Sequence, residues 1–592
     1  MLFRSELKPR DAPPGAQTAQ FTCGDLGQEV FQFEQIQTAQ KVFKADGAKL
    51  RISTTHTELA IVDGQHRAMA LLALYRNLKG GWNDARRQAY KHYYDVWPES
   101  FIRKFDTKNI QLPVMICTFP ELDQNYSGDF DVIRAARRIF LTLNKNARKV
   151  SDSRNKLLDD QDIASECLRE TLSLIKDANT RSQTSLRIFN VELDQEGDKQ
   201  AIGNPFAITG VSHLYYVCER ILFMNDRVTG LSSKSQRMAA RRNLSYVFER
   251  LKLNHVLSQA EKEAARRDSY PDKIADQVKT EWRKIFGPLI VRLLGEVHPL
   301  KVHQLASLKK HVEVEQTLSE SALKAILFDG QGTAKVLERF ASQLKENIRD
   351  DAVNWATPEI EATKAAIENI NHKREQVEKS LKELRALHYF EQFKGTLKSK
   401  LRKDGIVVKP IEEFVNRLMA RVGGTVAFQT ALIYTLVDMA ESAGTQLDDE
   451  FVGEYIQQIN NFFAPTTDAA LRSFVGVFEG GLTESDEQLA IAETNTRFSD
   501  IVYTGEMQPD EWPKYRYLIL EIWKSKSPAV AAKIEIEIKL LRLEIAEKVK
   551  DFEIKHYQEE TGKLPGALTE TERINCFAKA DQRCKTFFDF FK

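Results

Sequence analysis

A dense group of polar residues lies between two apolar segments near the start of the chain. It consists of Asp63, Gly64, Gln65, His66 and Arg67. The apolar residues 59–62 before it predict a strand, and the helical spacing of the apolar residues after it predicts a helix over 65–77. The first turn of a helix has N–H groups without intrahelical partners and a partial positive charge, so it attracts anions. Because Arg67 adds a fork of donors suited to phosphate oxygens, the pattern predicts a phosphate-binding turn.

A structural interpretation of the same residues is also open. Asp63 would then only cap the helix, and Arg67 would lie on a solvent-exposed face. We favour the phosphate-binding interpretation because five polar or small residues stand together between two apolar segments. Among the 11 histidines, His66 alone lies in such a dense polar motif.

A second polar group follows an expected helix over 130–143. The loop after this helix contains Asn144, Asn146 and Arg148. Amides interleaved with cations make a loop rich in hydrogen-bond donors, as a phosphate or metal–phosphate site requires. A solvated basic loop is the simpler interpretation when this loop is considered alone. In the sequence, an expected strand over 112–119 lies between the two polar groups. Because the ends of strands in an α/β layer meet at one crevice, we expect the two groups to form one shared site.

A third basic patch occurs at 231–242. It contains Lys234, Arg237, Arg241 and Arg242 at helical spacing. Clustered lysine and arginine can neutralise the phosphates of a nucleic-acid backbone, which gives affinity without sequence preference. An exposed helix face explains the same spacing, and we favour that explanation.

Length and composition limit the class of protein. A chain of 592 residues is too long for one hydrophobic core, so two to four domains are expected. The net charge of +1 means that any nucleic-acid surface is a local patch. The sequence has no Walker-type P-loop, no nucleophile elbow and no His-Glu-x-x-His zinc motif. We expect neither zinc nor haem, and a nucleotide site would have to work without the Walker lysine.

Cysteine usage and hydropathy bear on the compartment. The six cysteines are scattered without a C-x-x-C pair, which is typical of reduced, mostly buried thiols. No apolar run approaches the roughly 20 residues of a membrane span, and the sequence does not open with a basic-then-apolar secretion signal. We expect a cytoplasmic protein without a membrane partner.

The two halves of the chain differ in pattern. Up to about residue 225, strands and helices are mixed, and from about 235 onward the pattern is almost entirely helical. Strands are expected at 50–54, 58–62 and 112–119, and further helices at 83–95, 152–158 and 160–176. The organisation predicts an α/β N-terminal domain over 1–230, a helical middle region over 231–350 and a helical C-terminal domain over 351–592.

Two long helices are expected in the C-terminal half. One begins at Thr357 and Pro358, with Pro358 in the first turn. Its heptad-like stripe, typical of a helical hairpin or short coiled coil, consists of Ile367, Ile370, Val377, Leu381 and Leu384. The other begins near Pro528, and its stripe consists of Ile534, Ile538, Leu541 and Ile545. We expect both stripes to belong to the intramolecular core. Glycine pairs at 423–424 and 480–481 predict breaks between helices.

The pentapeptide at 63–67 resembles the motif that gives the DGQHR-domain family its name. This family comprises DndB-type proteins linked to DNA phosphorothioate modification and related accessory proteins of deazaguanine DNA modification. Three later segments, at 139–150, 151–162 and 181–194, strengthen the resemblance. The similarity covers roughly residues 25–225, so the helical half of the chain lies outside it.

The resemblance implies a ParB/sulfiredoxin-like α/β domain, followed here by a large, mainly α-helical C-terminal region. In that superfamily an arginine-bearing turn and an Asn/Arg loop bind the phosphates of a nucleotide, and several relatives hydrolyse it. By position, residues 63–67 would form the phosphate-binding turn. Asn144, Asn146 and Arg148 would supply the opposing loop.

The first of three functions is a nucleotide-hydrolysing protein of a bacterial DNA-modification or phage-defence system. It would use ATP or another nucleoside triphosphate with Mg²⁺, and Arg67 and Arg148 would neutralise the triphosphate. Gln65 or His66 would orient the attacking water. The magnesium ligand would be Asp63 or Asp159.

Two other functions remain open. The protein could be a non-catalytic DNA-binding transcriptional regulator, in which the same cations contact the phosphates of the DNA backbone. It could also be a helical scaffold for a partner enzyme of a modification or defence system. DNA is the expected partner in the first two cases, and a homo-oligomer is compatible with all three.

Overall fold

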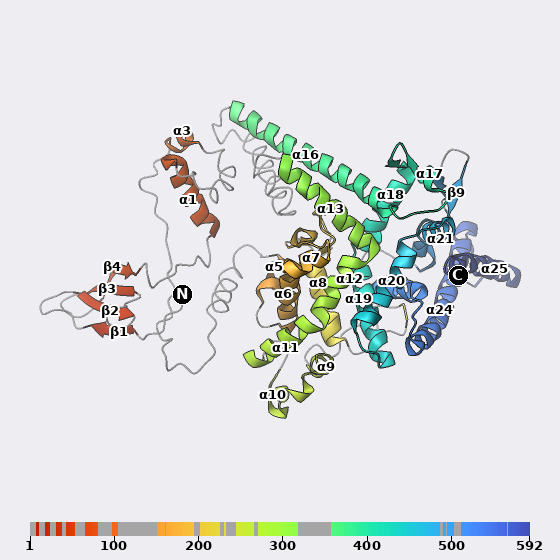
Figure 1. The fold of residues 1–592 in the computed structure, drawn as a ribbon, viewed down its shortest axis with the longest axis horizontal. Coiled ribbons are helices and arrows are strands. Elements are labelled where there is room, and N and C mark those ends of the chain that lie inside the picture. The colour runs from red at the N-terminus through yellow and green to blue at the C-terminus, as the bar shows by residue number, and fades with distance from the viewer. Residues whose placement is uncertain are drawn as a thin grey trace. The chain divides into compact units, whose positions relative to one another are not determined.

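The computed structural model describes most of the C-terminal part of the chain and shorter stretches of the N-terminal part. The described residues are 7–10, 18–23, 31–37, 43–53, 65–80, 98–104, 151–159, 162–193, 202–224, 230–231, 244–265, 270–317, 357–485, 489–492, 494–502, 511–564 and 566–592. The chain divides into two compact units, Met1–Val150 and Ser151–Lys592. Each unit is described by itself below (Figure 1).

The first unit contains a four-stranded antiparallel sheet in which each strand pairs with the next in sequence. Its strands are β1 (Leu7–Arg10), β2 (Thr18–Cys23), β3 (Phe31–Gln37) and β4 (Phe43–Ile52). The register places Phe21 opposite Phe33, and Phe33 opposite Leu50, so large apolar residues align across three strands. The strand expected at 50–54 is the end of β4.

The first unit also contains α1 (Gln65–Lys79) and the short α3 (Glu99–Ile102), which contact one another. The helix expected over 65–77 is confirmed by α1. Ala73 and Ile102 are each 2% exposed, so both helices have an apolar anchor. The strands expected at 58–62 and 112–119 and the helices expected at 83–95 and 130–143 lie outside the described residues.

The second unit is almost entirely helical. Its helices are α5 (Asp152–Leu158), α6 (Ile163–Lys176), α7 (Ala178–Gln183), α8 (Val211–Phe223), α9 (Ser245–Arg250), α10 (Gln259–Ala264), α11 (Asp272–Lys284), α12 (Phe286–Glu296), α13 (His298–Thr317), α16 (Thr357–Tyr389), α17 (Lys398–Leu401), α18 (Lys409–Leu418), α19 (Val426–Ala443), α20 (Asp449–Phe463), α21 (Asp468–Glu479), α22 (Phe498–Ile501), α23 (Trp512–Ile522), α24 (Pro528–Thr561) and α25 (Glu570–Asp589). Three small strand pairs join the loops: β5 (Val191–Glu192) with β6 (Thr209–Gly210), β7 (Arg402–Lys403) with β8 (Ile406–Val407), and β9 (Leu482–Glu484) with β10 (Leu489–Ile491).

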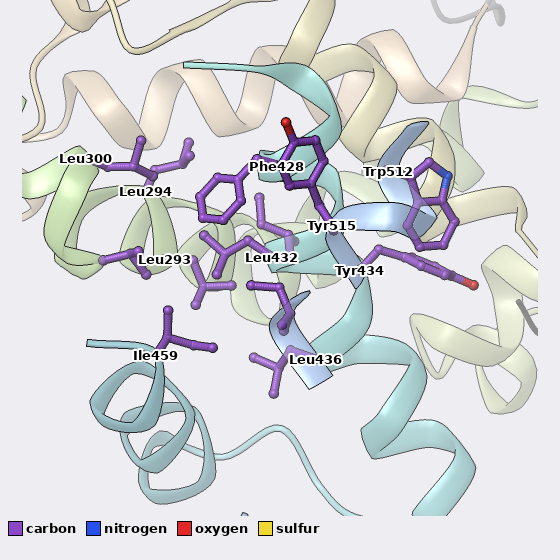
Figure 2. Packing of buried hydrophobic residues seen from close by; sticks show 14 of the residues in the cluster. Leu293, Leu294, Leu300, Phe428, Leu432, Tyr434, Leu436, Ile459, Trp512 and Tyr515 are labelled. Carbon is purple, nitrogen blue, oxygen red and sulfur yellow. The ribbon is translucent and has the colours of Figure 1, made fainter. Parts of the chain in front are cut away.

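Helix α19 lies at the centre of this unit. Every residue from Val426 to Ala440 is buried, and a helix that is buried all round has neighbours on every side. It contacts α8, α12, α23 and α24. Figure 2 shows Phe428, Leu432 and Leu436 of α19 among side chains of α12, α13, α20 and α23. Burying each such side chain contributes about 1.5–3 kcal/mol to folding.

Local sequence signals set the ends of these helices. Ser151 caps α5 by accepting a hydrogen bond from the Arg154 N–H. Between α18 and α19, a π-helical turn ends at Gly423, which confirms the break expected at the first glycine pair. Gly480 ends α21 with a φ of +94°, a conformation that L residues rarely adopt, so the second pair is a break as well.

The two apolar stripes occupy the core, as expected, wherever their side chains are described. Val377 and Leu381 of α16 are 8% and 2% exposed and share a small cluster with Ala306 and Val314 of α13. Helices α13 and α16 lie side by side (Figure 1). The stripe of α24 is likewise part of the main core.

The boundary between the two compact units lies at 150/151, and residues 151–223 share the core of the helical unit. The sequence pattern groups them instead with the expected N-terminal α/β domain over 1–230. The physical reason for their placement is α8, which is buried over most of its length. It packs against α6 on one side and α19 on another, so it is as much a core helix as α19 itself.

In the described part of the chain, no single helix is both long and apolar enough to cross a bilayer. The segments Lys409–Gly423 and Val426–Ala443 meet the length and composition criteria only together, and they are bent by 64°. The second of these segments is α19, at the centre of the core.

Candidate phosphate-binding site

The backbone of α1 begins at Gln65, directly after the Asp63-Gly64 turn of the sequence. Gln65, His66 and Arg67 therefore form the first turn of a 15-residue helix. Asp63 and Gly64 lie outside the described residues, and for Gln65, His66 and Arg67 only the backbone is described. The helix start thus confirms the expected position of the motif, while the direction of the Arg67 side chain stays a prediction.

The charges along α1 are arranged unevenly with respect to the helix dipole. Its first turn contains no acidic residue, although acids are the residues that a helix N-terminus stabilises. The sequence places Arg67 there instead, and the helix dipole disfavours a cation at a helix N-terminus. Arg76 and Lys79 lie in the last turn, where the dipole favours cations. A bound anion at the first turn would offset the unfavourable placement of Arg67.

The opposing loop and the basic patch cannot be compared with α1 in space. Asn144, Asn146 and Arg148 lie outside the described residues. The same holds for Lys234, Arg237, Arg241 and Arg242. The convergence of the two polar groups on one crevice therefore stays a prediction.

Asp159 is described, and it occupies the C-terminal cap of α5 in the helical unit. Its backbone N–H donates to the Asn155 carbonyl (2.9 Å), and its carbonyl accepts from Arg169 Nη1 (3.0 Å). Arg169 Nη1 also donates to the Leu157 carbonyl (3.0 Å), so it joins the end of α5 to α6. Cations at a helix C-terminus bind the last carbonyls in this way. Among the residues that the structure describes, no three His, Cys, Asp or Glu side chains gather as metal ligands do.

Two adjoining cavities, each of about 720 Å³, open on the helical unit. They share Pro288, Arg292 and Asp449. Arg292 Nη1 lies 3.3 Å from the Asp449 carboxylate, and Arg250 binds both oxygens of Glu441 at 2.6 and 2.9 Å. Both arginines therefore already have carboxylate partners. Sequence reasoning did not find these cavities, because residues of helices far apart in the chain form them jointly: α9, α12, α19 and α20 around the first, and α6, α7, α12 and α20 around the second.

A buried polar network was also missed. Arg385 Nη1 donates to His303 Nδ1 (2.8 Å), and Arg385 Nε donates to Asn416 Oδ1 (3.0 Å). Since Nδ1 of His303 accepts, Nε2 carries the proton and donates to the Phe206 carbonyl (3.2 Å). The three side chains come from α13, α16 and α18. No local sequence motif indicates such a network, because its members are more than 30 residues apart in the chain.

Burial sets the charge states in this network. It lowers the pKa of His303 to about 3, with a smaller contribution from the nearby charge of Arg385. It also lowers the pKa of Arg385 to about 10. Arg385 is thus a buried cation whose hydrogen-bond partners here, His303 and Asn416, are neutral. The arrangement holds α13, α16 and α18 together.

Comparison of the chain with protein-family models, with curated proteins and with solved structures finds no match. The interpretation of the site therefore depends on the residues of the DGQHR motif and on the helix that carries them.

Proposed function

We propose that this protein binds and hydrolyses a nucleoside triphosphate with Mg²⁺, as a DGQHR-domain component of a bacterial DNA-modification or phage-defence system. The domain that binds the nucleotide would be ParB/sulfiredoxin-like and would lie N-terminal to the helical unit. DNA, or a protein bound to DNA, would be the partner whose state the hydrolysis controls.

One observation carries the proposal. Helix α1 starts within the motif, so Arg67 is placed in a first turn that has no acidic residue. The unpaired N–H groups of the first turn, the positive end of the dipole and a guanidinium would then face the same anion. This is the arrangement that a di- or triphosphate requires, and it does not depend on a Walker lysine.

Each residue of the motif would have its own role in binding or hydrolysis. Arg67 would hold phosphate oxygens by paired hydrogen bonds, and the backbone of the turn at Gly64 would leave room for the phosphate to approach closely. Asp63 would supply a carboxylate for Mg²⁺, which neutralises charge on the leaving phosphates when bound. Gln65 and His66 are the candidates to position the attacking water.

The test is phosphate release from ATP, CTP and GTP in the presence of Mg²⁺, together with calorimetric titration of each nucleotide. We expect Arg67→Ala to weaken nucleotide binding about 10- to 100-fold, since a hydrogen bond to a charged group contributes about 1.5–3 kcal/mol. Gln65→Ala and His66→Ala should retain binding, and at least one of them should lose turnover.

Lys79→Ala is the matched control, because it removes a cation from the exposed last turn of the same helix. It should bind and hydrolyse as the wild type does, and circular dichroism should show the same helix content in all variants. Wild-type turnover by Arg67→Ala would refute the assignment. Absence of nucleotide binding, combined with salt-dependent retention of duplex DNA, would replace it with the DNA-binding regulator.

A further inference from the structure

Helix α24 has a second apolar stripe, on the face opposite its buried one. Ile536, Leu540 and Leu543 are 60%, 57% and 65% exposed. Their spacing of four and then three residues places them on one face, as in the seam of a coiled coil. The buried side of the helix, which includes Leu541 and Ile545, packs into the core of the unit.

Single exposed apolar residues are ordinary, but three in one seam on a long helix are not. Helix α24 has 34 residues, which corresponds to a length of about 51 Å at 1.5 Å per residue. Its neighbours α19, α23 and α25 leave this stripe uncovered by the described part of the chain. Figure 1 shows α24 as one of the longest helices of the unit.

The charges at the two ends of the stripe have opposite signs. Lys533 lies three residues before Ile536, and Glu547 lies four residues after Leu543, so both continue the seam. Each is seven residues from Leu540. Lys533 forms no ion pair with the described part of the chain, and the Glu547 side chain is 73% exposed in a surface pair with Lys550 (3.2 Å).

We infer that α24 pairs antiparallel with α24 of a second copy of this chain, around a two-fold axis at Leu540. In this pairing Leu540 meets its own copy, and Ile536 meets Leu543 of the other helix. Lys533 of each copy meets Glu547 of the other at both ends of the stripe. The same surface serves both copies, as a two-fold interface requires.

The charges at the two ends of the stripe favour an antiparallel pairing and a second copy of α24 as the partner. A parallel pair of α24 helices would place Lys533 against Lys533 and Glu547 against Glu547, and both contacts are repulsive. The antiparallel pair turns each of them into an attraction. Lys533 and Glu547 lie at equal distances from Leu540 on opposite sides. The stripe is therefore complementary to a second copy of itself in the antiparallel direction.

The experiment is sedimentation velocity of the full chain from low to high micromolar concentration. The wild type should shift from monomer to dimer, and Leu540→Glu should stay monomeric at every concentration. Ile406→Glu is the matched control, because Ile406 on β8 is 64% exposed and lies outside the stripe. It should dimerise as the wild type does, and circular dichroism should confirm that both variants are folded.

Charge reversal tests the direction of pairing independently of the apolar contacts. Lys533→Glu and Glu547→Lys should each raise the dimer dissociation constant about tenfold, because each converts two attractions into two repulsions. The double variant should recover the wild-type constant. A wild type that stays monomeric would overturn the inference, and so would a dimer that Leu540→Glu leaves intact or a double variant that does not recover.

Discussion

Acid should destabilise the helical unit through His303. In the folded state this side chain is neutral, since its pKa is lowered from 6.5 to about 3 and both ring nitrogens are engaged. In the unfolded chain it takes up a proton below pH 6.5. The unfolded state therefore binds more protons between pH 6.5 and 3, and stability rises with pH across this window. Acidification removes that stability.

The magnitude follows from the two pKa values. Between pH 7 and pH 5, the linkage relation gives a loss of about 2 kcal/mol from His303 alone. His298, whose pKa is lowered to about 4 by burial, acts in the same direction. Because His303 is 2% exposed, solvent screening does not reduce its contribution appreciably.

The assay is urea unfolding followed by tryptophan fluorescence, since Trp282, Trp512 and Trp523 are all fully buried in this unit. The wild type is compared with His303→Gln at pH 7, 6 and 5. The glutamine cannot take up a proton, so the variant should be less stable at pH 7 but lose about 2 kcal/mol less on going to pH 5. If both proteins lose the same free energy of unfolding between pH 7 and pH 5, then His303 is not a neutral side chain with both ring nitrogens hydrogen-bonded in the folded state.

Three further substitutions should change stability by different mechanisms, each measured as a shift in the urea midpoint. Leu432→Ala opens a cavity at the centre of α19 and should cost about 2–5 kcal/mol, and no shift would mean that the site collapses. Gly476→Ala places a Cβ 2.4 Å from the Phe590 ring and should cost about 1–3 kcal/mol. Thr569→Ala removes one half of the capping box with Glu572 and should cost about 1 kcal/mol, with faster amide exchange in the first turn of α25.

Elements with local signals were predictable from the sequence. The helix at 152–158 has a serine cap before it, and the structure has the same bounds. The long helices α16 and α24 begin at Thr357 and Pro528. A proline in the first turn, Pro358 or Pro528, indicates the start of each helix. The start of α1 within the motif was predictable for a different reason, because in the sequence a polar segment separates two apolar patterns of different period.

Features that depend on distant residues were not predictable. His303, Arg385 and Asn416 are ordinary surface-type residues in the sequence, and only the packing of α13, α16 and α18 makes them a buried network. The placement of residues 151–223 in the helical unit has the same origin. An apolar run such as that of α8 shows that a helix is buried, but it does not show which partners bury it.

The central position of α19 has a consequence for synthesis of the chain on the ribosome. Helix α8 ends at Phe223 and depends on α19 for burial, and α19 in turn is covered by α24, which ends at Thr561. At roughly 5–20 residues per second, translation from one point to the other takes on the order of tens of seconds. Until α24 has been made, the side of α19 that it covers has no partner in the nascent polypeptide and stays open to solvent.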